Sequence, residues 1–159
     1  MVTTQGMGRT TNVSDEILFV RNDCSALVIT CSDFRFKTVE RIFGESSTLH
    51  DDYDLIARPG GIRSLVSPRN KTAVESMEEE IRSLWNVHGF SRLLMVNHMS
   101  CRAYDDLTAR EDERTLHRTH LLAAGALIER RFEGITPEPY LVGLVDGALQ
   151  VQRLSATTS

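Results

Sequence analysis

Two short groups of polar residues in this sequence carry side chains that bind transition metals. Residues 30–35 (TCSDFR) contain Cys31, and residues 97–101 (NHMSC) contain His98 and Cys101. Two thiolates and one imidazole are a donor set used by catalytic zinc sites, which keep a fourth position open for water or substrate. His98 and Cys101 lie three residues apart, so a single turn can present both donors, while Cys31 comes from a separate segment. We therefore predict that these three residues hold a zinc ion.

The same first group contains a carboxylate and a guanidinium, Asp33 and Arg35. Side chains two residues apart in an extended chain point to the same side, so Asp33 lies within reach of a metal held by Cys31 as a ligand or as a base. Arg35 can form a bidentate bond with that carboxylate, which would restrain Asp33 and leave space for water. We predict Asp33 and Arg35 as the catalytic pair and Asp33 also as a candidate ligand. A plain surface ion pair, which would contribute only ~0–1 kcal/mol, is the alternative.

Short apolar segments that are typical of strands precede both polar groups. Residues 26–30 (ALVIT) lead into the first group, and residues 92–97 (RLLMVN) lead into the second. Both are continuous apolar runs expected of strands buried on both faces. Asp146-Gly147 is a hairpin signal that leads into an alternating segment typical of an antiparallel edge strand. The remaining predicted strands are residues 54–57, 140–145 and 149–154.

Helical spacing of apolar residues occurs between these segments. The clearest helix follows Pro68 and stops at Gly89, and a second covers residues 115–132, with Pro137 and Pro139 expected to end it. Shorter helices are predicted at residues 37–43 and 14–20.

The alternation of strands and helices predicts the fold class. It indicates one α/β domain whose mostly parallel sheet has strand order 2-1-3-4, with an antiparallel edge strand 5 and helices on both sides. Ligands bind such sheets beyond the carboxyl ends of the strands, where the strand order reverses, and the two polar groups would meet there.

Length and charge restrict the class of protein further. A chain of 159 residues suits one domain; we expect residues 1–14 to be a flexible N-terminus and residues 15–159 to form the domain. Eighteen basic and twenty-two acidic residues give a formal charge of -4, which predicts no nucleic-acid or membrane partner. Three widely spaced cysteines and the absence of an apolar leader indicate a cytoplasmic protein with reduced thiols.

The pattern Cys31-x-Asp33-x-Arg35 after one strand and His98-x-x-Cys101 after a later one resembles the β-class carbonic anhydrases. Residues 54–62 (DLIARPGGI) resemble that family's glycine-containing loop, and residues 141–147 resemble its closing hairpin. The resemblance covers about residues 15–154.

The resemblance implies an activity, a cofactor and an assembly. It implies a zinc ion on Cys31, His98 and Cys101, with water or Asp33 in the fourth place, and reversible hydration of carbon dioxide to bicarbonate by a metal-bound hydroxide. It also implies an Asp33/Arg35 gate and a homodimer or higher homo-oligomer built partly from swapped N-terminal helices. Gly60 and Gly61 of the glycine loop are candidate substrate-binding residues.

Three residues depart from the family pattern. Phe34 takes the place of a small residue, Pro59 stands where asparagine is usual, and Arg102 replaces a glycine, so that a bulky cation can close the pocket or favour an anionic substrate. Related zinc proteins on this scaffold hydrolyse carbonyl sulfide or carbon disulfide, which is the alternative activity. A non-catalytic zinc-binding or nucleotide-binding regulatory domain is the alternative of another class. Structural roles are predicted for the remaining cysteine and histidines, which are Cys24, His50, His88, His117 and His120.

Overall fold

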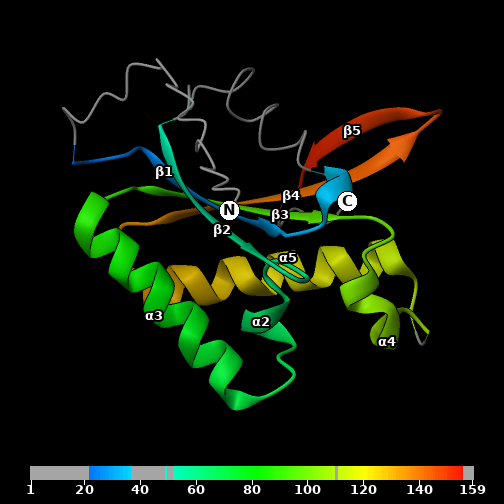
Figure 1. Ribbon diagram of the computed structural model, residues 1–159, viewed down its shortest axis with the longest axis horizontal. Coiled ribbons are helices and arrows are strands. Elements are labelled where there is room, and N and C mark those ends of the chain that lie inside the picture. The colour runs from blue at the N-terminus through cyan, green and yellow to red at the C-terminus, as the bar shows by residue number, and fades with distance from the viewer. Residues whose placement is uncertain (1–21, 37–48, 50–51, 110, 156–159) are drawn as a thin grey trace, which may run out of the picture.

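A five-stranded mixed sheet forms the centre of the structure, a computed structural model that describes residues 22–36, 49, 52–109 and 111–155 (Figure 1). The strand order is β2-β1-β3-β4-β5; the first three pairings are parallel, and β4 and β5 pair antiparallel. This confirms the predicted α/β class, strand order and antiparallel edge. The strands are β1 (Ala26–Cys31), β2 (Tyr53–Arg58), β3 (Arg92–His98), β4 (Thr136–Val145) and β5 (Ala148–Arg153).

Strands β1 and β3 form the buried middle of the sheet. All six residues of β1 are buried, as are the last six of β3, because each strand has neighbours on both edges and core on both faces. Side chains of β1 alternate between two apolar clusters: Leu27 and Ile29 belong to the larger one, and Ala26 and Val28 to the smaller one. This burial fixes the ends of both strands, and with them the polar groups that follow.

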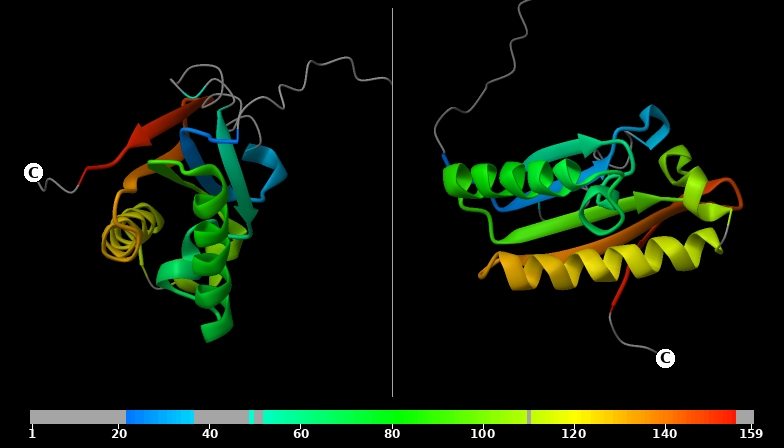
Figure 2. Two further views of the ribbon diagram at one scale, coloured as in Figure 1. Left: turned by 90° about the vertical axis from the view of Figure 1, so that its left-hand side faces the viewer. Right: turned by 90° about the horizontal axis from the view of Figure 1, so that it is seen from below.

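The described helices lie on one face of the sheet, as Figures 1 and 2 show. The sequence predicted helices on both sides, but its two further helices, at residues 14–20 and 37–43, lie outside the described residues. The long helix predicted between Pro68 and Gly89 is confirmed. The helices are α2 (Arg63–Val66), α3 (Lys71–His88), α4 (Asp105–Thr108) and α5 (Glu113–Arg131), with short 3-10 turns η1 (Phe34–Phe36) and η2 (Arg102–Tyr104).

Both long helices have defined ends. The Asn70 side chain caps α3 by accepting a hydrogen bond from Ala73 N–H at 2.9 Å, and α3 ends at Gly89 in the left-handed conformation, φ 62°. Asp112 caps α5 in the same way, accepting from Thr115 N–H at 2.9 Å. Helix α5 lies between β3 and β4 in the chain and packs against both strands. It therefore covers the strand that carries His98.

Strand β4 begins earlier than the sequence indicated. It starts at Thr136 and includes Pro137 and Pro139, so the prediction that both prolines precede the strand was wrong. The Pro139 carbonyl accepts Leu154 N–H at 2.8 Å, which places the nitrogens of both prolines on the edge away from β3. Ladder pairing with β5 starts only at Tyr140, so no ladder bond requires an N–H from either proline.

The hairpin between β4 and β5 has the predicted two-residue turn. Asp146 and Gly147 both have positive φ, 51° and 77°, as a type I′ turn requires. No helix in the described part of the chain is both long and apolar enough to cross a membrane.

Candidate metal centre

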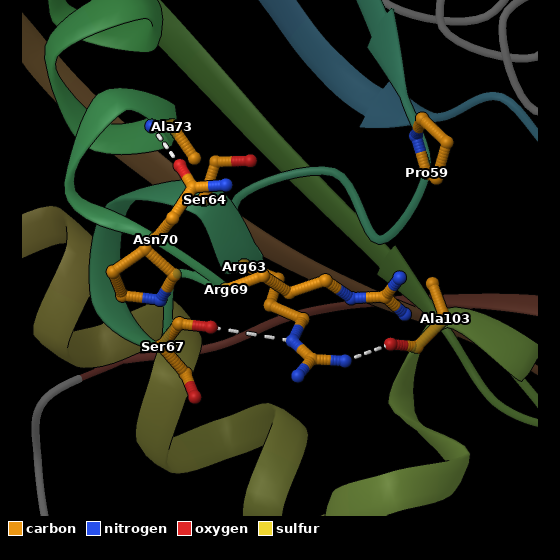
Figure 3. A pocket seen from close by; sticks show the side chains of 9 residues that line it. Pro59, Arg63, Ser64, Ser67, Arg69, Asn70, Ala73 and Ala103 are labelled. Carbon is orange, nitrogen blue, oxygen red and sulfur yellow. Dashed lines mark hydrogen bonds between the residues drawn. The ribbon is translucent and has the colours of Figure 1, made fainter.

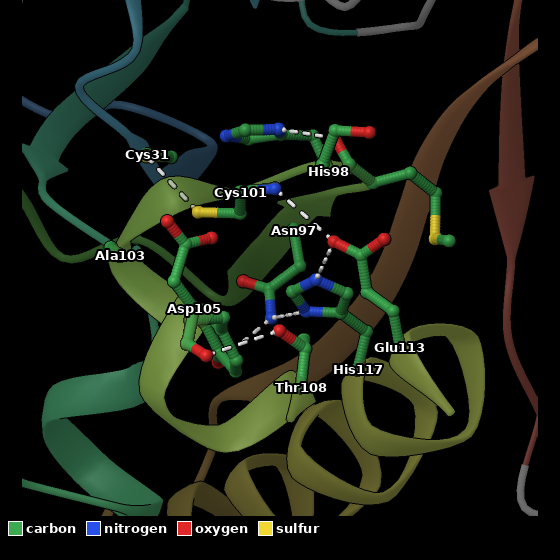
Figure 4. Close-up of polar contacts among 12 residues, drawn as sticks. Cys31, Asn97, His98, Cys101, Ala103, Asp105, Thr108, Glu113 and His117 are labelled. Atoms are coloured by element: carbon green, nitrogen blue, oxygen red, sulfur yellow. Dashed lines mark hydrogen bonds and ion pairs between the residues drawn. The ribbon is translucent and has the colours of Figure 1, made fainter. Parts of the chain in front are cut away.

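The structure brings the three predicted metal ligands together at the carboxyl ends of two neighbouring strands. Cys31 is the last residue of β1, His98 is the last residue of β3, and Cys101 follows three residues later. One donor atom from each lies within 4.8 Å of the other two, and the two Sγ atoms are 3.8 Å apart (Figure 4). All three residues are buried. The strand order reverses beside β1, so the cluster lies at the predicted switch point.

The environment of His98 suits metal coordination. Its Nδ1 lies 2.9 Å from the Met99 carbonyl oxygen and donates to it, so in the neutral ring Nε2 is the nitrogen with a free lone pair. Nε2 is buried and has no hydrogen-bond partner among the described residues. Phe36 stacks on the ring at 4.0 Å between centroids. A buried nitrogen that lacks a partner is costly unless something binds it, and a cation between Nε2 and the two sulfurs would do so. The residues therefore fit a zinc ion.

The two cysteines form a coupled pair that favours negative charge on Cys31. The hydrogen bond between the two sulfurs lowers the pKa of Cys31 and raises that of Cys101. The backbone N–H of Gly60 adds a second donor to Cys31 Sγ at 3.3 Å. A thiolate is the form that binds metal, so these contacts favour the form of Cys31 that a metal would require.

Gly60 and Gly61, the predicted substrate-binding residues, lie in the loop after β2. Both are buried with positive φ, 80° and 54°. A Cβ atom on Gly61 would lie 3.2 Å from Asn97 Oδ1 and 3.3 Å from the backbone nitrogen of Cys31, so glycine is needed for the loop to approach the site. The described lining of the adjoining cavity includes Pro59 from this loop but neither glycine.

Asp33 and Arg35 form the predicted ion pair. Arg35 Nη2 lies 2.6 Å from Asp33 Oδ2, and Nε lies 3.0 Å from Oδ1, so the contact is bidentate. The side-chain bond to Arg35 lowers the pKa of Asp33 to about 2, which keeps it ionised. Arg35 Nη2 also donates to the Ser100 carbonyl at 3.0 Å and so links the two polar groups. Asp33 Oδ2 lies 3.9 Å from His98 Nε2, just outside the three-donor cluster.

A cavity of about 530 Å³ opens beside the cysteines. Two of the residues that depart from the family pattern, Phe34 and Arg102, lie at its rim; the Phe34 side chain is 79% exposed, and Arg102 is also exposed. Neither side chain closes the cavity. Its described lining consists of Cys31, Ser32, Asp33, Phe34, Arg35, Pro59, Cys101, Arg102 and Ala103.

A buried polar network that the sequence did not predict supports the second polar group. Cys101 N–H donates to Glu113 Oε1 at 3.2 Å, and this oxygen lies 3.5 Å from His117 Nε2 (Figure 4). Asn97 Nδ2 lies 3.1 Å from both His117 Nδ1 and Tyr104 Oη. His117 is fully buried, in agreement with its predicted structural role. The only signals in the sequence are the position of Asn97 beside His98 and the i,i+4 spacing of Glu113 and His117.

Arg63 fixes the segment that follows Cys101. This buried guanidinium makes two 2.7 Å bonds to the Asp106 carboxylate and donates to the Ala103 carbonyl oxygen. It also lines a cavity of about 200 Å³ between α2 and the start of α3, where Ser67 accepts another of its bonds (Figure 3). The Arg63 side chain thus bonds to Ser67 on one side and to Ala103 and Asp106 on the other. It connects the segment after the glycine loop to η2 and α4 rather than offering its charge to a ligand.

Sequence comparisons place most of the chain in one family. The family described as "Putative carbonic anhydrase" matches residues 21–140. An uncharacterized protein of Rickettsia bellii is 29% identical over 144 residues, which cover 87% of this chain and 87% of that protein. An uncharacterized protein of Rickettsia conorii is 27% identical over 144 residues, which cover 87% of this chain and 77% of that protein.

Solved structures with a similar fold are carbonic anhydrases. The enzyme from Streptococcus mutans has a TM-score of 0.51 and 15% identity, covering 83% of this chain and 84% of its own. A carbonic anhydrase from Glaciozyma antarctica has a TM-score of 0.51 and 12% identity, covering 86% of each chain. One of two tetrameric β-carbonic anhydrases from Sordaria macrospora has a TM-score of 0.51 and 14% identity, covering 87% and 84%. With its β-carbonic anhydrase fold and a match over most of its length, the chain belongs to the putative carbonic anhydrase family.

Proposed function

We propose that this protein is a zinc-dependent carbonate dehydratase that converts carbon dioxide and water into bicarbonate and a proton, and the reverse. The observation that carries the proposal is the convergence of Cys31, His98 and Cys101 within 4.8 Å at the switch point of a β-carbonic anhydrase fold. The orphaned Nε2 of His98 supports the same assignment, because it is buried without a hydrogen-bond partner on a residue whose donor atoms lie beside those of Cys31 and Cys101.

Cys31, His98 and Cys101 would hold the zinc ion, and both cysteines also line the adjoining cavity. Zinc is a Lewis acid that lowers the pKa of water from 15.7 toward about 7, which makes a nucleophile available near neutral pH. The Met99 carbonyl keeps His98 in the tautomer that presents Nε2, and Gly60 N–H stabilises the Cys31 sulfur.

Asp33 would orient the reacting water. Its Oδ2 faces His98 Nε2 and is ionised, so it can accept a hydrogen bond from a water molecule at the open position. A carboxylate held so firmly by Arg35 is a weak base, so the proton released in the reaction would leave through the cavity to buffer. Arg35 acts as a positioning residue, because its bonds to Asp33 and to the Ser100 carbonyl fix the carboxylate between the two polar groups.

The cavity walls combine apolar and charged side chains. Phe34 and Pro59 contribute apolar surface close to Cys31, and Arg102 contributes a cation at the rim that suits release or capture of bicarbonate. Carbonyl sulfide has the same linear shape as carbon dioxide and is the second candidate substrate. A parallel assay for hydrogen sulfide release separates the two substrates.

We also infer that the protein acts as a homo-oligomer. The Sordaria macrospora β-carbonic anhydrases of similar fold are tetrameric, and the apolar Leu144 side chain on β4, in a residue 66% exposed, would suit coverage by another copy. Light scattering during size-exclusion chromatography should give at least a dimer at micromolar concentration. A monomer under these conditions would contradict this inference.

Stopped-flow carbon dioxide hydration tests the proposed function. Zinc-loaded wild-type protein should hydrate carbon dioxide far above the buffer rate, and Cys101→Ala should return to the buffer rate because one of two thiolate ligands is lost. Arg130→Ala, an exposed position on α5, is the control and should retain the full rate. Equal rates for wild type and Cys101→Ala, with both folded by circular dichroism, would refute the proposal.

A further inference from the structure

A second cluster of metal-binding side chains lies at the opposite end of the sheet. Cys24 precedes β1 by two residues, Asp54 is the second residue of β2, and His88 is the last residue of α3. One donor atom from each lies within 4.8 Å of the other two. Cys31 ends β1, whereas this cluster surrounds its start, so the two clusters are separated by the length of the strand (Figure 1).

The cluster is held in place by contacts among three elements. His88 Nδ1 lies 2.7 Å from Asp54 Oδ2, and Cys24 N–H donates to the His88 carbonyl oxygen at 3.1 Å. The Cys24 thiol donates to the Ala26 carbonyl at 3.3 Å, which turns the sulfur back toward the strand. The three donors are thus prearranged by the backbone of β1, β2 and α3, and only small shifts would be needed to bring them around one ion.

Electrostatics at this position favours a cation. The carboxyl end of an 18-residue helix carries a negative partial charge, and His88 and the Asp54 carboxylate lie at that end of α3. The side chains of His88 and Asp54 are 34% and 19% exposed, so an ion has access from solvent.

A nucleophilic Cys-His-Asp triad is the other chemistry that these residue types allow. Burial, followed by the nearby Asp54 charge, raises the pKa of Cys24 to about 11, so the free thiol stays protonated at neutral pH. A triad nucleophile requires the reverse, and among the cavities described in the structure, none of substrate size adjoins this cysteine. A metal ion overcomes this difficulty because coordination itself deprotonates a thiol.

We propose that Cys24, Asp54 and His88 form a second transition-metal site, with zinc as the metal that best matches one sulfur, one nitrogen and one oxygen donor. Asp54 serves either as the third ligand or as the partner that orients the His88 ring. A metal bound there joins the starts of β1 and β2 to the end of α3, and it is independent of the metal centre at Cys31.

Cobalt(II) titration tests this proposal, since cobalt reports thiolate ligation through a sulfur-to-metal charge-transfer absorption band. The Cys31→Ala/Cys101→Ala double variant removes both sulfurs of the other cluster. This variant should still bind one equivalent of cobalt with a thiolate band, and adding Cys24→Ala should abolish the band and weaken binding at least a hundredfold. Metal should also raise the melting temperature of the double variant but not of the triple variant.

A conservative variant guards against misfolding of the alanine variants. His88→Gln removes the ring donors while keeping a polar side chain at the end of α3, and in otherwise wild-type protein it should reduce cobalt stoichiometry from two equivalents to one. One equivalent for wild type and an unchanged value for His88→Gln would overturn the second site. That result would leave the carbon dioxide hydration assay unaffected, so the two proposals can fail separately.

Discussion

Asp33 is held by Arg35, which is close to it in sequence, and Arg35 is in turn held by Ser100 of a distant segment. Arg35 binds both carboxylate oxygens and also donates to the Ser100 carbonyl, which lies in the other polar group. The two-residue steps from Cys31 to Asp33 and from Asp33 to Arg35 are sufficient to predict this pair from the sequence. The link to Ser100 could not be predicted, because it depends on how β1 and β3 pair.

Replacement of Asp33 by asparagine should separate metal binding from turnover. The change removes the negative charge that faces His98 Nε2 and would orient water, so hydration should fall by about a hundredfold, the usual effect of misplacing a reacting group. Zinc content should stay unchanged, which metal analysis and stopped-flow kinetics check on the same sample. Glu129→Gln on the exposed face of α5 is the charge-matched control. A full rate for Asp33→Asn would remove this residue from the mechanism.

Glu113 supports the candidate metal centre by accepting a hydrogen bond from the Cys101 backbone. Glu113→Ala would leave Cys101 N–H without its acceptor, which should cost about 1–3 kcal/mol of unfolding free energy. Zinc affinity should fall roughly 10–100-fold, as is usual when a residue that positions a ligand is lost. Glu113→Gln keeps an oxygen acceptor and should recover most of both quantities in denaturation and competition titrations. Equal zinc affinity for the alanine variant and wild type would contradict the assigned role.

The Glu113 network could not be found in the sequence. An i,i+4 Glu-His pair on a helix is usually a solvated pair, and nothing in the pattern shows that α5 buries His117 against Asn97. By contrast, Cys31, His98 and Cys101 could be predicted as a set because their residue types are unusual and because they follow strands.

At the scale of elements, apolar periodicity was sufficient for the long helices and the buried strands and insufficient for the short elements. Helices α2 and α4 have four residues each, too few to show a period, although they carry Arg63 and Asp106, which hold the segment after Cys101. The predicted start of β4 was too late because of its two prolines. Proline fits within a strand only where its nitrogen faces an unpaired edge, and the sequence alone does not show which part of β4 is unpaired.

Two glycines should respond to alanine substitution in opposite directions. Gly61 has positive φ and little space, so Gly61→Ala should lower the free energy of unfolding by about 1–3 kcal/mol. Gly125 lies within α5, where an added Cβ would make an ordinary 3.6 Å contact with Met95 Cε. Gly125→Ala should therefore stabilise the protein by up to about 1 kcal/mol. Urea denaturation of both variants checks this, and a stabilised Gly61→Ala would contradict the loop geometry.

At the scale of the whole molecule, one buried and one half-buried histidine should make stability depend on pH. Burial is the main cause that lowers the pKa of His117 and of His120, whereas the unfolded chain has ordinary values near 6.5. Below pH 6.5 the unfolded state therefore binds protons that the folded state does not. The free energy of unfolding should therefore fall as the pH decreases below 6.5. Above pH 6.5 both histidines are neutral in the folded and the unfolded state, so they cause no pH dependence there.

This pH dependence is measured by urea denaturation of metal-free protein at pH 7.5, 6.5 and 5.5. His120→Gln removes one of the two groups and should lose less stability than wild type between pH 6.5 and 5.5, with no difference in slope above pH 7. Identical profiles for the variant and wild type would show that His120 titrates normally in the folded protein.

X-ray absorption at the zinc edge tests the central claim, the convergence of two sulfurs and one imidazole on one ion, most directly. The sample is Cys24→Ala protein loaded with one equivalent of zinc, so that only the centre at Cys31, His98 and Cys101 contributes sulfur. We predict two sulfur neighbours at about 2.3 Å and at least one nitrogen neighbour at about 2.0 Å. A coordination sphere of nitrogen and oxygen alone would contradict the account.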